Sequence, residues 1–326
     1  MTVPDASAAL PEAPPRTWRG RLALAAKLAV TVGVLVLLAV RADWSGVAAR
    51  FADLSPGWLA LGVLLKAAGI LFAGERWRWA AASCGAVISS WTALRLMLAG
   101  LFLGQMLPGA LGGDVARGWL TYRAGCPAAS VVTAMILDRL LALVGVVVIM
   151  FVGLPHLVTA SPPSVAWAPP LATLALAVGV AVGLQIDRVP LPAVLLRPPV
   201  TALLDQVGRL RNALFTRAAL VSGFHAAGVH ITTIAAVVAF ARALDLPVSP
   251  MDALSVVPVA IFAAALPISL NGWGVREGAM AAGLALFGIG SAEAVVLSLL
   301  IGVSVTLLTL PGGLLWLTLK AEAPQR

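Results

Sequence analysis

The sequence predicts an all-α polytopic membrane protein, and three observations support this fold class. Of the 326 residues, 60% are hydrophobic and 11% are charged, whereas a soluble domain carries about 25% charged residues. Apolar segments of nearly the length that crosses a bilayer recur along the chain. Arginines flank these segments, as they do in proteins that follow the positive-inside rule. We therefore expect a multi-pass protein of the cytoplasmic membrane.

Three regions are expected along the chain: a disordered cytoplasmic tail at residues 1–19, one transmembrane region at 20–320 and a short cytoplasmic tail at 321–326. The first tail is rich in Ala and Pro, a composition typical of disorder. It lacks a basic stretch before an early apolar run, so it is not expected to be a secretory signal. The arginines that precede the first apolar run favour a cytoplasmic N-terminus.

Complete spans are expected where apolar segments are long and contain few charges. Between the third and fourth spans, Pro155–Pro170 is predicted to be an external loop, because it contains no acidic or basic residue. Asp187–Arg217 contains five arginines and is predicted to be cytoplasmic, with an amphipathic surface helix at Leu203–Leu214. About six spans are expected: Leu22–Val40, Gly57–Gly74, Ser130–Val152, Leu171–Ile186, Ala218–Ala241 and Ala294–Leu319.

The segments 88–126 and 251–289 are predicted to be re-entrant helical hairpins. If the first of them crossed the membrane completely, the arginine-rich 187–217 connection would lie outside, against the positive-inside rule. With two re-entrant hairpins, both chain termini are cytoplasmic and the hairpins enter from opposite faces. The alternative is a protein with eight or more complete spans.

The two predicted hairpins share a short pattern. An apolar arm ends at a proline, followed by leucine at +3, glycine at +5 and arginine at +9. Opposite entry of two similar hairpins is the arrangement of an inverted repeat, in which broken helices meet near the membrane midplane. The matching residues are Pro108, Leu111, Gly113 and Arg117 in the first hairpin, and Pro267, Leu270, Gly272 and Arg276 in the second.

Each hairpin arginine follows a glycine-rich turn, and this combination favours an anion site. Free backbone N–H groups at a helix start attract anions, and guanidinium grips phosphate with two donors. In an apolar surrounding, these groups suit a lipid phosphate headgroup. The predicted phosphate-binding residues are Arg117, Arg276, Gly112, Gly113, Asn271, Gly272 and Gly274.

Other charged residues are predicted to support this site or line the path. Asp114 and Glu277 are expected to hold the hairpin arginines when no phosphate is bound, or to contact a cationic part of the headgroup. The alternative is that they only form stabilising ion pairs at the hairpin tips. Asp138 and Arg139 are adjacent, so on a helix their side chains diverge by about 100° and need separate partners. Arg76 and Arg78 complete this supporting set, although with Trp77, Trp79 and Trp273 they are also typical of a membrane interface.

Several other functions are not expected from this sequence. The net charge of +8 is explained by membrane topology and anionic lipids, so no nucleic-acid partner is expected. Cys84 and Cys126 are too far apart for a metal or disulfide framework. His225 and His230 lie on different helix faces, and no nucleotide fingerprint or nucleophile motif occurs. We expect no metal, no cofactor and no enzymatic activity.

Four motifs in order resemble the lysylphosphatidylglycerol synthase transmembrane-region family of flippase-like proteins: Arg76-Trp77-Arg78, Pro108–Arg117 with Gly-Gly-Asp, Asp138-Arg139-Leu140-Leu141 and Pro267–Glu277 with Asn-Gly-x-Gly-Val-Arg-Glu. The resemblance covers about residues 20 to 320 and implies a bacterial-type membrane protein that handles phospholipid or polyprenyl-phosphate lipids. We expect a stand-alone member, because no soluble synthase domain follows Lys320; this puts an aminoacyl-lipid substrate in doubt.

The function predicted from these observations is that of a lipid translocase, which moves a phosphate-bearing lipid between leaflets. Its expected partners are lipids with anionic phosphate headgroups and a separate lipid-modifying synthase or glycosyltransferase. Two alternatives remain open. One is a membrane enzyme acting on a lipid phosphate with Asp138 or Glu277 as a base, and the other is a non-catalytic membrane partner of such a synthase.

Overall fold

The computed structural model describes residues 18–41, 52–106, 112–164, 167–188, 197–266, 268–269 and 272–322, and these residues form helices and their connections without a strand. Within this part of the chain, four helices are long and apolar enough to cross a membrane: Pro56–Ser83, Ala128–Ala160, Arg217–Ala243 and Ser291–Leu319. Shorter apolar helices accompany them at Ala25–Val40, Pro170–Gly183 and Pro250–Ala265. The all-α polytopic membrane fold is thus confirmed.

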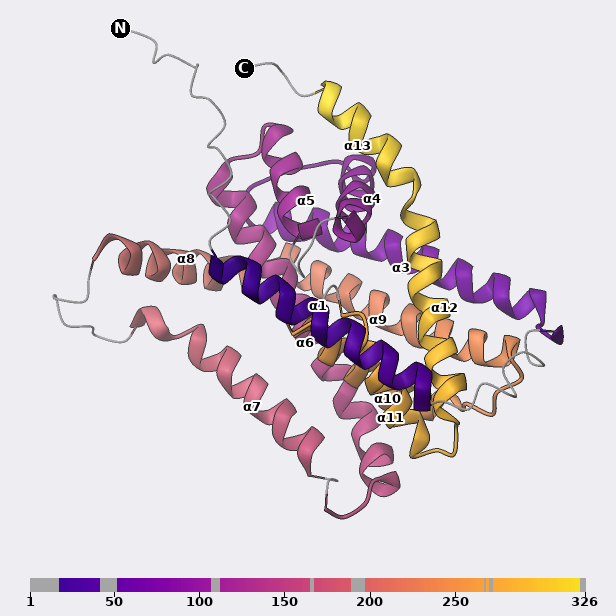
Figure 1. Cartoon of the computed structure of the whole chain (residues 1–326). Helices are drawn as coiled ribbons and strands as arrows, with labels where there is room; N and C mark the ends of the chain where they lie inside the picture. The colour runs from indigo at the N-terminus through magenta and orange to yellow at the C-terminus, as the bar shows by residue number, and fades with distance from the viewer. Residues whose placement is uncertain are drawn as a thin grey trace, which may run out of the picture.

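Helices α3 (Pro56–Ser83) and α9 (Arg217–Ala243) pack against each other along their lengths (Figure 1). Glycines on α3 allow this close approach, because a Cβ at Gly62 would overlap the ring of Phe240. Helix α6 (Ala128–Ala160) packs across both of them. Without a hydrophobic driving force between membrane helices, such small-residue contacts contribute much of the association.

The first hairpin consists of α4 (Ser90–Met106) and α5 (Gly112–Arg123). Its two arms touch at backbone level, because a Cβ at Gly113 would lie 2.5 Å from the carbonyl oxygen of Gly100 and 3.1 Å from the Cα of Gly104. Each arm is shorter than the roughly 20 residues that span a bilayer. This length agrees with a helical hairpin that turns back.

The second hairpin consists of α10 (Pro250–Ala265) and α11 (Val275–Ala285), which also pack against each other. Ser249 and Asp252 form a reciprocal capping box at the start of α10, which satisfies two backbone donors. Gly274 precedes α11 with a φ of 82°, in the left-handed region that favours glycine. The turn therefore requires this residue type.

Long helices carry the two hairpins at opposite ends. On α6, Asp138 contacts α5 and Gly153 accepts a hydrogen bond from Ser255 of α10; these positions are roughly 22 Å apart along the helix axis. Helix α12 (Ser291–Thr309) packs against α11, and α13 (Pro311–Glu322), which follows it, packs against α4 (Figure 1). This placement supports hairpins that approach from opposite sides, while their orientation in the cell remains a prediction.

Three element boundaries differ from the sequence prediction. Helix α3 continues past Gly74 to Ser83, so Glu75–Trp79 lies inside a helix. Helix α6 continues to Ala160 with Pro155 inside it, because a proline is tolerated in membrane helices where neighbours satisfy the freed backbone groups. The last predicted span is divided between α12 and α13 at Pro311, which suits the first turn of a new helix.

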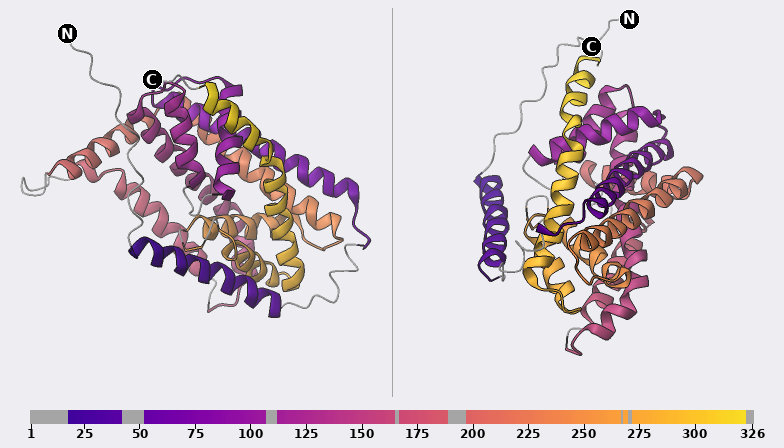
Figure 2. Two further views of the ribbon diagram at one scale, coloured as in Figure 1. Left: turned by 45° about the horizontal axis from the view of Figure 1, so that its top comes forward. Right: turned by 90° about the vertical axis from the view of Figure 1, so that its right-hand side faces the viewer.

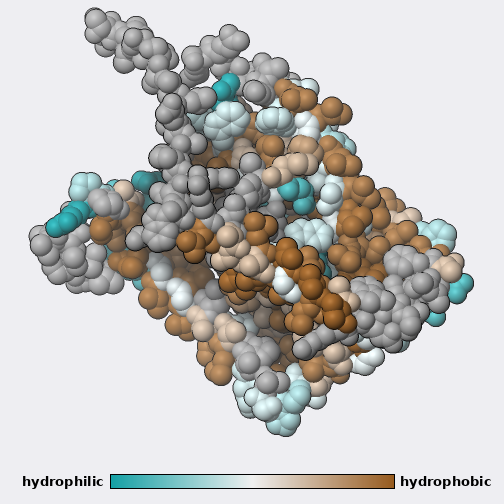
Figure 3. Space-filling view, in the orientation of Figure 1, coloured by the Kyte–Doolittle hydropathy of each residue, from teal (hydrophilic) through white to brown (hydrophobic). Residues whose placement is uncertain are grey.

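The periphery consists of α1 (Trp18–Arg41), which lies against α11 and α12 (Figure 2), and of α7 (Ala168–Gly183), η1 (Ile186–Arg188) and α8 (Pro198–Leu214). The predicted amphipathic helix is confirmed within α8, since Leu210 and Ala213 are buried while Asp205 and Arg209 are exposed. Much of the surface in Figure 3 is hydrophobic, as a lipid-facing surface should be. The predicted disordered tail lies almost wholly outside the described residues, as does most of the Arg41–Pro56 connection.

Candidate functional site

The first part of the candidate site is an ion-pair cluster that joins three helices. Asp138 of α6 accepts hydrogen bonds from Arg76 of α3 at 2.8 and 3.2 Å and from Arg117 of α5 at 2.9 Å. The Asp138 side chain is 1% exposed. A carboxylate this deeply buried requires cationic partners, and two arginines from different helices supply them.

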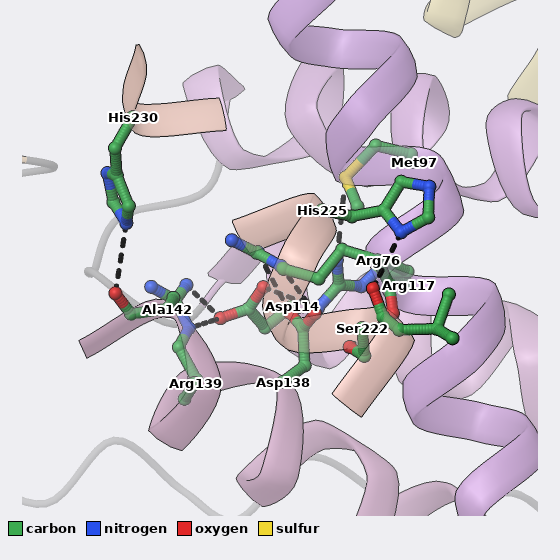
Figure 4. Close-up of polar contacts among 11 residues, drawn as sticks. Arg76, Met97, Asp114, Arg117, Asp138, Arg139, Ala142, Ser222, His225 and His230 are labelled. Carbon is green, nitrogen blue, oxygen red and sulfur yellow. Dashed lines mark hydrogen bonds and ion pairs between the residues drawn. The ribbon is translucent and has the colours of Figure 1, made fainter. Parts of the chain in front are cut away.

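Asp114 extends this cluster toward solvent-accessible space. It accepts a hydrogen bond from Arg117 at 3.2 Å and pairs with Arg139, whose side chain is 49% exposed. Figure 4 shows the resulting alternation of arginines and carboxylates. The prediction that Asp138 and Arg139 take separate partners is therefore confirmed, and so is the pairing of Asp114 with Arg117.

The interface interpretation of Arg76 and Trp77 is wrong. Trp77 is 0% exposed, and the guanidinium carbon of Arg117 lies 4.2 Å from the centroid of its ring, a cation–π distance. Both residues are internal because α3 continues beyond Gly74. The spacing of the buried positions Gly74, Trp77 and Ala81 is helical, and this periodicity was the signal in the sequence. Arg78, by contrast, pairs with Glu75 in a partly exposed position.

The second part of the candidate site lies at the start of α11. Arg276 donates to Glu277 Oε1 through Nε at 3.0 Å and Nη2 at 2.6 Å, and Nε also donates to Ser298 of α12 at 3.1 Å. Glu277 is 0% exposed. The guanidinium carbon of Arg276 lies 4.9 Å from the centroid of the Trp273 ring. Thus, like Arg117, Arg276 lies against a tryptophan and pairs with a carboxylate, as predicted for Glu277.

The backbone of this turn is engaged within the protein. The N–H of Gly274, which was predicted to bind phosphate, donates to Glu277 Oε2 at 2.7 Å. Gly272 has a φ of 79°, and its carbonyl oxygen accepts from the N–H of Arg276. Asn271 lies outside the described residues. In the second hairpin, the arginine side chain is therefore a better candidate for anion binding than the Gly274 amide.

Both hairpins open onto one cavity of about 580 Å³. Gly113, Asp114 and Arg117 line it from the first hairpin, and Trp273 and Arg276 line it from the second. Gly112 starts α5 beside it. The structure thus brings together the two arginines that the sequence pattern paired.

The remaining wall of the cavity is mostly apolar. It includes side chains from α4, α6, α10 and α12, and a Cβ at Gly302 of α12 would lie 2.6 Å from Arg276 Nη2 and 2.8 Å from Trp273 Cη2. Gly302 therefore makes room for the second arginine and its tryptophan. Apolar lining residues are Leu101, Leu143, Val146, Ile261, Phe262, Ala264, Ala265 and Val305.

Two polar residues of the membrane helices were not assigned a role from the sequence. His230 lines the cavity, and its Nε2 lies 3.0 Å from the Ala142 carbonyl oxygen. Lys66 of α3 is buried and donates to Thr233 at 3.0 Å. The sequence feature that could have singled out Lys66 is its position within an apolar segment, because a charged residue in a membrane helix is usually functional or partnered.

Comparison with known proteins identifies the family of this chain. Residues 24–312 match the family described as "Lysylphosphatidylglycerol synthase TM region". The chain belongs to this family. The matched range includes both arginine clusters and the glycine of α12 that accommodates the second one. A search of curated proteins gave no significant match.

Proposed function

We propose that this member of the lysylphosphatidylglycerol synthase transmembrane-region family is a lipid translocase in a cytoplasmic membrane, with both termini on the cytoplasmic side. The observation that carries the proposal is the single cavity lined by Arg117 and Arg276. These arginines come from hairpins that contact α6 at two separate places, Asp138 and Gly153. A headgroup held in this cavity can be contacted by an arginine of either hairpin, and the two hairpins are proposed to enter from opposite leaflets.

The chemistry of the cavity favours an amphiphile with an anionic headgroup. Arginine forms bidentate, charge-assisted hydrogen bonds with phosphate oxygens. The apolar wall suits the first carbon atoms of a lipid chain, because burial of apolar surface is favourable. A free phosphate ion shares the first interaction but not the second.

Exposure suggests an order of contact. The side chain of Arg276 is 20% exposed and that of Arg117 is 3% exposed, so a headgroup would first meet Arg276 and the half-exposed Arg139. Contact with Arg117 requires it to exchange Asp114 or Asp138 for the phosphate. Movement of the headgroup from one arginine to the other would then accompany a change in the relative position of the hairpins, as in alternating access.

The test is a leaflet-resolved assay in proteoliposomes with an acyl-labelled phosphatidylglycerol. The wild-type protein should move the lipid, whereas Arg276→Ala should reduce the rate to that of empty vesicles. Arg209→Ala is the matched control, because Arg209 is exposed on α8 and bonds to Gln206. An Arg276→Ala protein with unimpaired transport would contradict the role of this arginine.

A parallel measurement separates lipid transport from ion transport. Radiolabelled inorganic phosphate is placed outside the same vesicles, and its uptake is followed. Phosphate uptake without movement of the labelled lipid would overturn the lipid assignment. Lipid movement without phosphate uptake is the expected result.

A further inference from the structure

We infer that the cavity selects headgroups that carry a net negative charge and no ammonium group. This inference rests on the proposed lipid translocation and specifies its substrate class. It follows from an asymmetry: the carboxylate oxygens around the cavity already have partners, whereas several arginine N–H groups have none among the described residues.

Each carboxylate oxygen of the first cluster already has an arginine partner. Asp138 Oδ1 accepts from Arg76, and Asp138 Oδ2 accepts from both Arg76 and Arg117. Asp114 Oδ1 accepts from Arg117, while Asp114 Oδ2 pairs with Nε and Nη2 of Arg139. An ammonium group would have to compete with an arginine at each of these oxygens.

The carboxylate of the second cluster is engaged in the same way. Glu277 Oε1 accepts hydrogen bonds from Arg276 and from Ser298 Oγ, and Oε2 accepts from the Gly274 N–H. Glu277 is also completely buried. It therefore holds the turn and the arginine in place and offers no free acceptor to a cationic headgroup.

Donors, in contrast, remain available. No hydrogen-bond partner in the described part of the chain is found for Nη1 of Arg276 or Nη1 of Arg139, and both residues line the cavity. The Nε of Arg117 is buried and also lacks a partner there. Four arginines and three carboxylates make up the two clusters, which leaves a net positive charge.

The consequence is a site with two accessible cationic contact points, Arg276 and Arg139, and no complementary anionic one. Phosphate oxygens can accept from the free donors, because hydrogen bonds between charged groups are stronger than those between neutral groups. The ammonium group of a zwitterionic or aminoacylated lipid would be desolvated beside arginines without a carboxylate, which is unfavourable. An uncharged remainder such as glycerol avoids this cost.

The experiment compares acyl-labelled phosphatidylglycerol, phosphatidylethanolamine and lysyl-phosphatidylglycerol in the same proteoliposomes. We expect phosphatidylglycerol to move at least about tenfold faster than either amine-bearing lipid, which corresponds to about 1.4 kcal/mol. Equal rates for all three lipids would overturn the selectivity while leaving translocation intact. No movement of any lipid would instead contradict the proposed function itself.

Arg139→Gln tests the physical cause. This substitution removes both donors to Asp114 Oδ2 and leaves an acceptor for an ammonium group in the cavity. The rate ratio of phosphatidylglycerol to phosphatidylethanolamine should fall toward one, whereas Arg139→Lys and Arg209→Gln should keep the wild-type ratio. A ratio that is unchanged in an active, folded Arg139→Gln protein would show that carboxylate saturation does not set the selectivity.

Discussion

Arg117 of the first hairpin and Arg276 of the second line the same cavity, although they belong to separate helices, α5 and α11. Each guanidinium lies against a tryptophan ring, Trp77 or Trp273. Each also pairs with a buried carboxylate. The same combination at two places supports the interpretation that both hairpins perform equivalent steps on one ligand.

Asp138→Asn should strongly destabilise the protein. Its carboxylate holds Arg76 and Arg117, and both arginines are largely buried. Removal of one partner from a buried ion pair costs about 3–5 kcal/mol, because the other charge stays buried. Thermal unfolding in detergent should show a clearly lower midpoint. Asp205→Asn, at an exposed position on α8, is the control and should leave the midpoint almost unchanged; equal midpoints for both variants would contradict the structural role of Asp138.

Gly302→Ala should impair transport more than stability. The added Cβ would meet Nη2 of Arg276 and Cη2 of Trp273 at 2.6 and 2.8 Å. These atoms are the ends of side chains that line the cavity, so they can shift while the backbone stays in place. We expect a transport rate at least about tenfold lower with a similar unfolding midpoint. Gly179→Ala on α7, where nothing lies within 4 Å, should retain the wild-type rate.

Gly113→Ala, in contrast, should impair stability more than transport. Here the added Cβ would lie 2.5 Å from the backbone oxygen of Gly100, and α4 and α5 must separate to accept it. Overpacking of this kind costs about 1–3 kcal/mol. The unfolding midpoint should fall, and limited proteolysis should cut the first hairpin sooner. Gly57→Ala at the start of α3, an open position, is the control, and identical proteolysis of the two variants would argue against close hairpin packing.

The sequence was sufficient to predict the fold class and the residues of both hairpins. Both predictions depend on the lengths of the apolar segments and the positions of the arginines, which are visible in the linear order of residues. It also indicated that Asp138 and Arg139 need different partners, since neighbouring helical side chains diverge. It could not show that Arg76 joins Arg117 at Asp138. That contact depends on how three helices pack, and no local pattern encodes their relative rotation.

The same limit explains the misplacement of Trp77 and the role given to Gly274. A tryptophan next to arginines is typical of a membrane interface, and only the continuation of α3 to Ser83 places Trp77 in the interior. A glycine turn before a helix is typical of an anion site, but the Gly274 N–H already donates a hydrogen bond to Glu277. In both cases a tertiary contact outweighs a valid local preference.

Cysteine labelling should distinguish six spans with two re-entrant hairpins from eight or more complete spans. In the first topology, Ser164→Cys should react with an impermeant maleimide added outside, and Asp205→Cys should react only after permeabilisation; both positions are exposed. The native cysteines give little background. Cys126 is buried, and burial raises the pKa of the Cys84 thiol to about 11, so it is largely protonated at neutral pH and reacts slowly. Labelling of Asp205→Cys from outside and of Ser164→Cys only from inside would refute the re-entrant topology, because it would place the arginine-rich connection before α9 on the outer side.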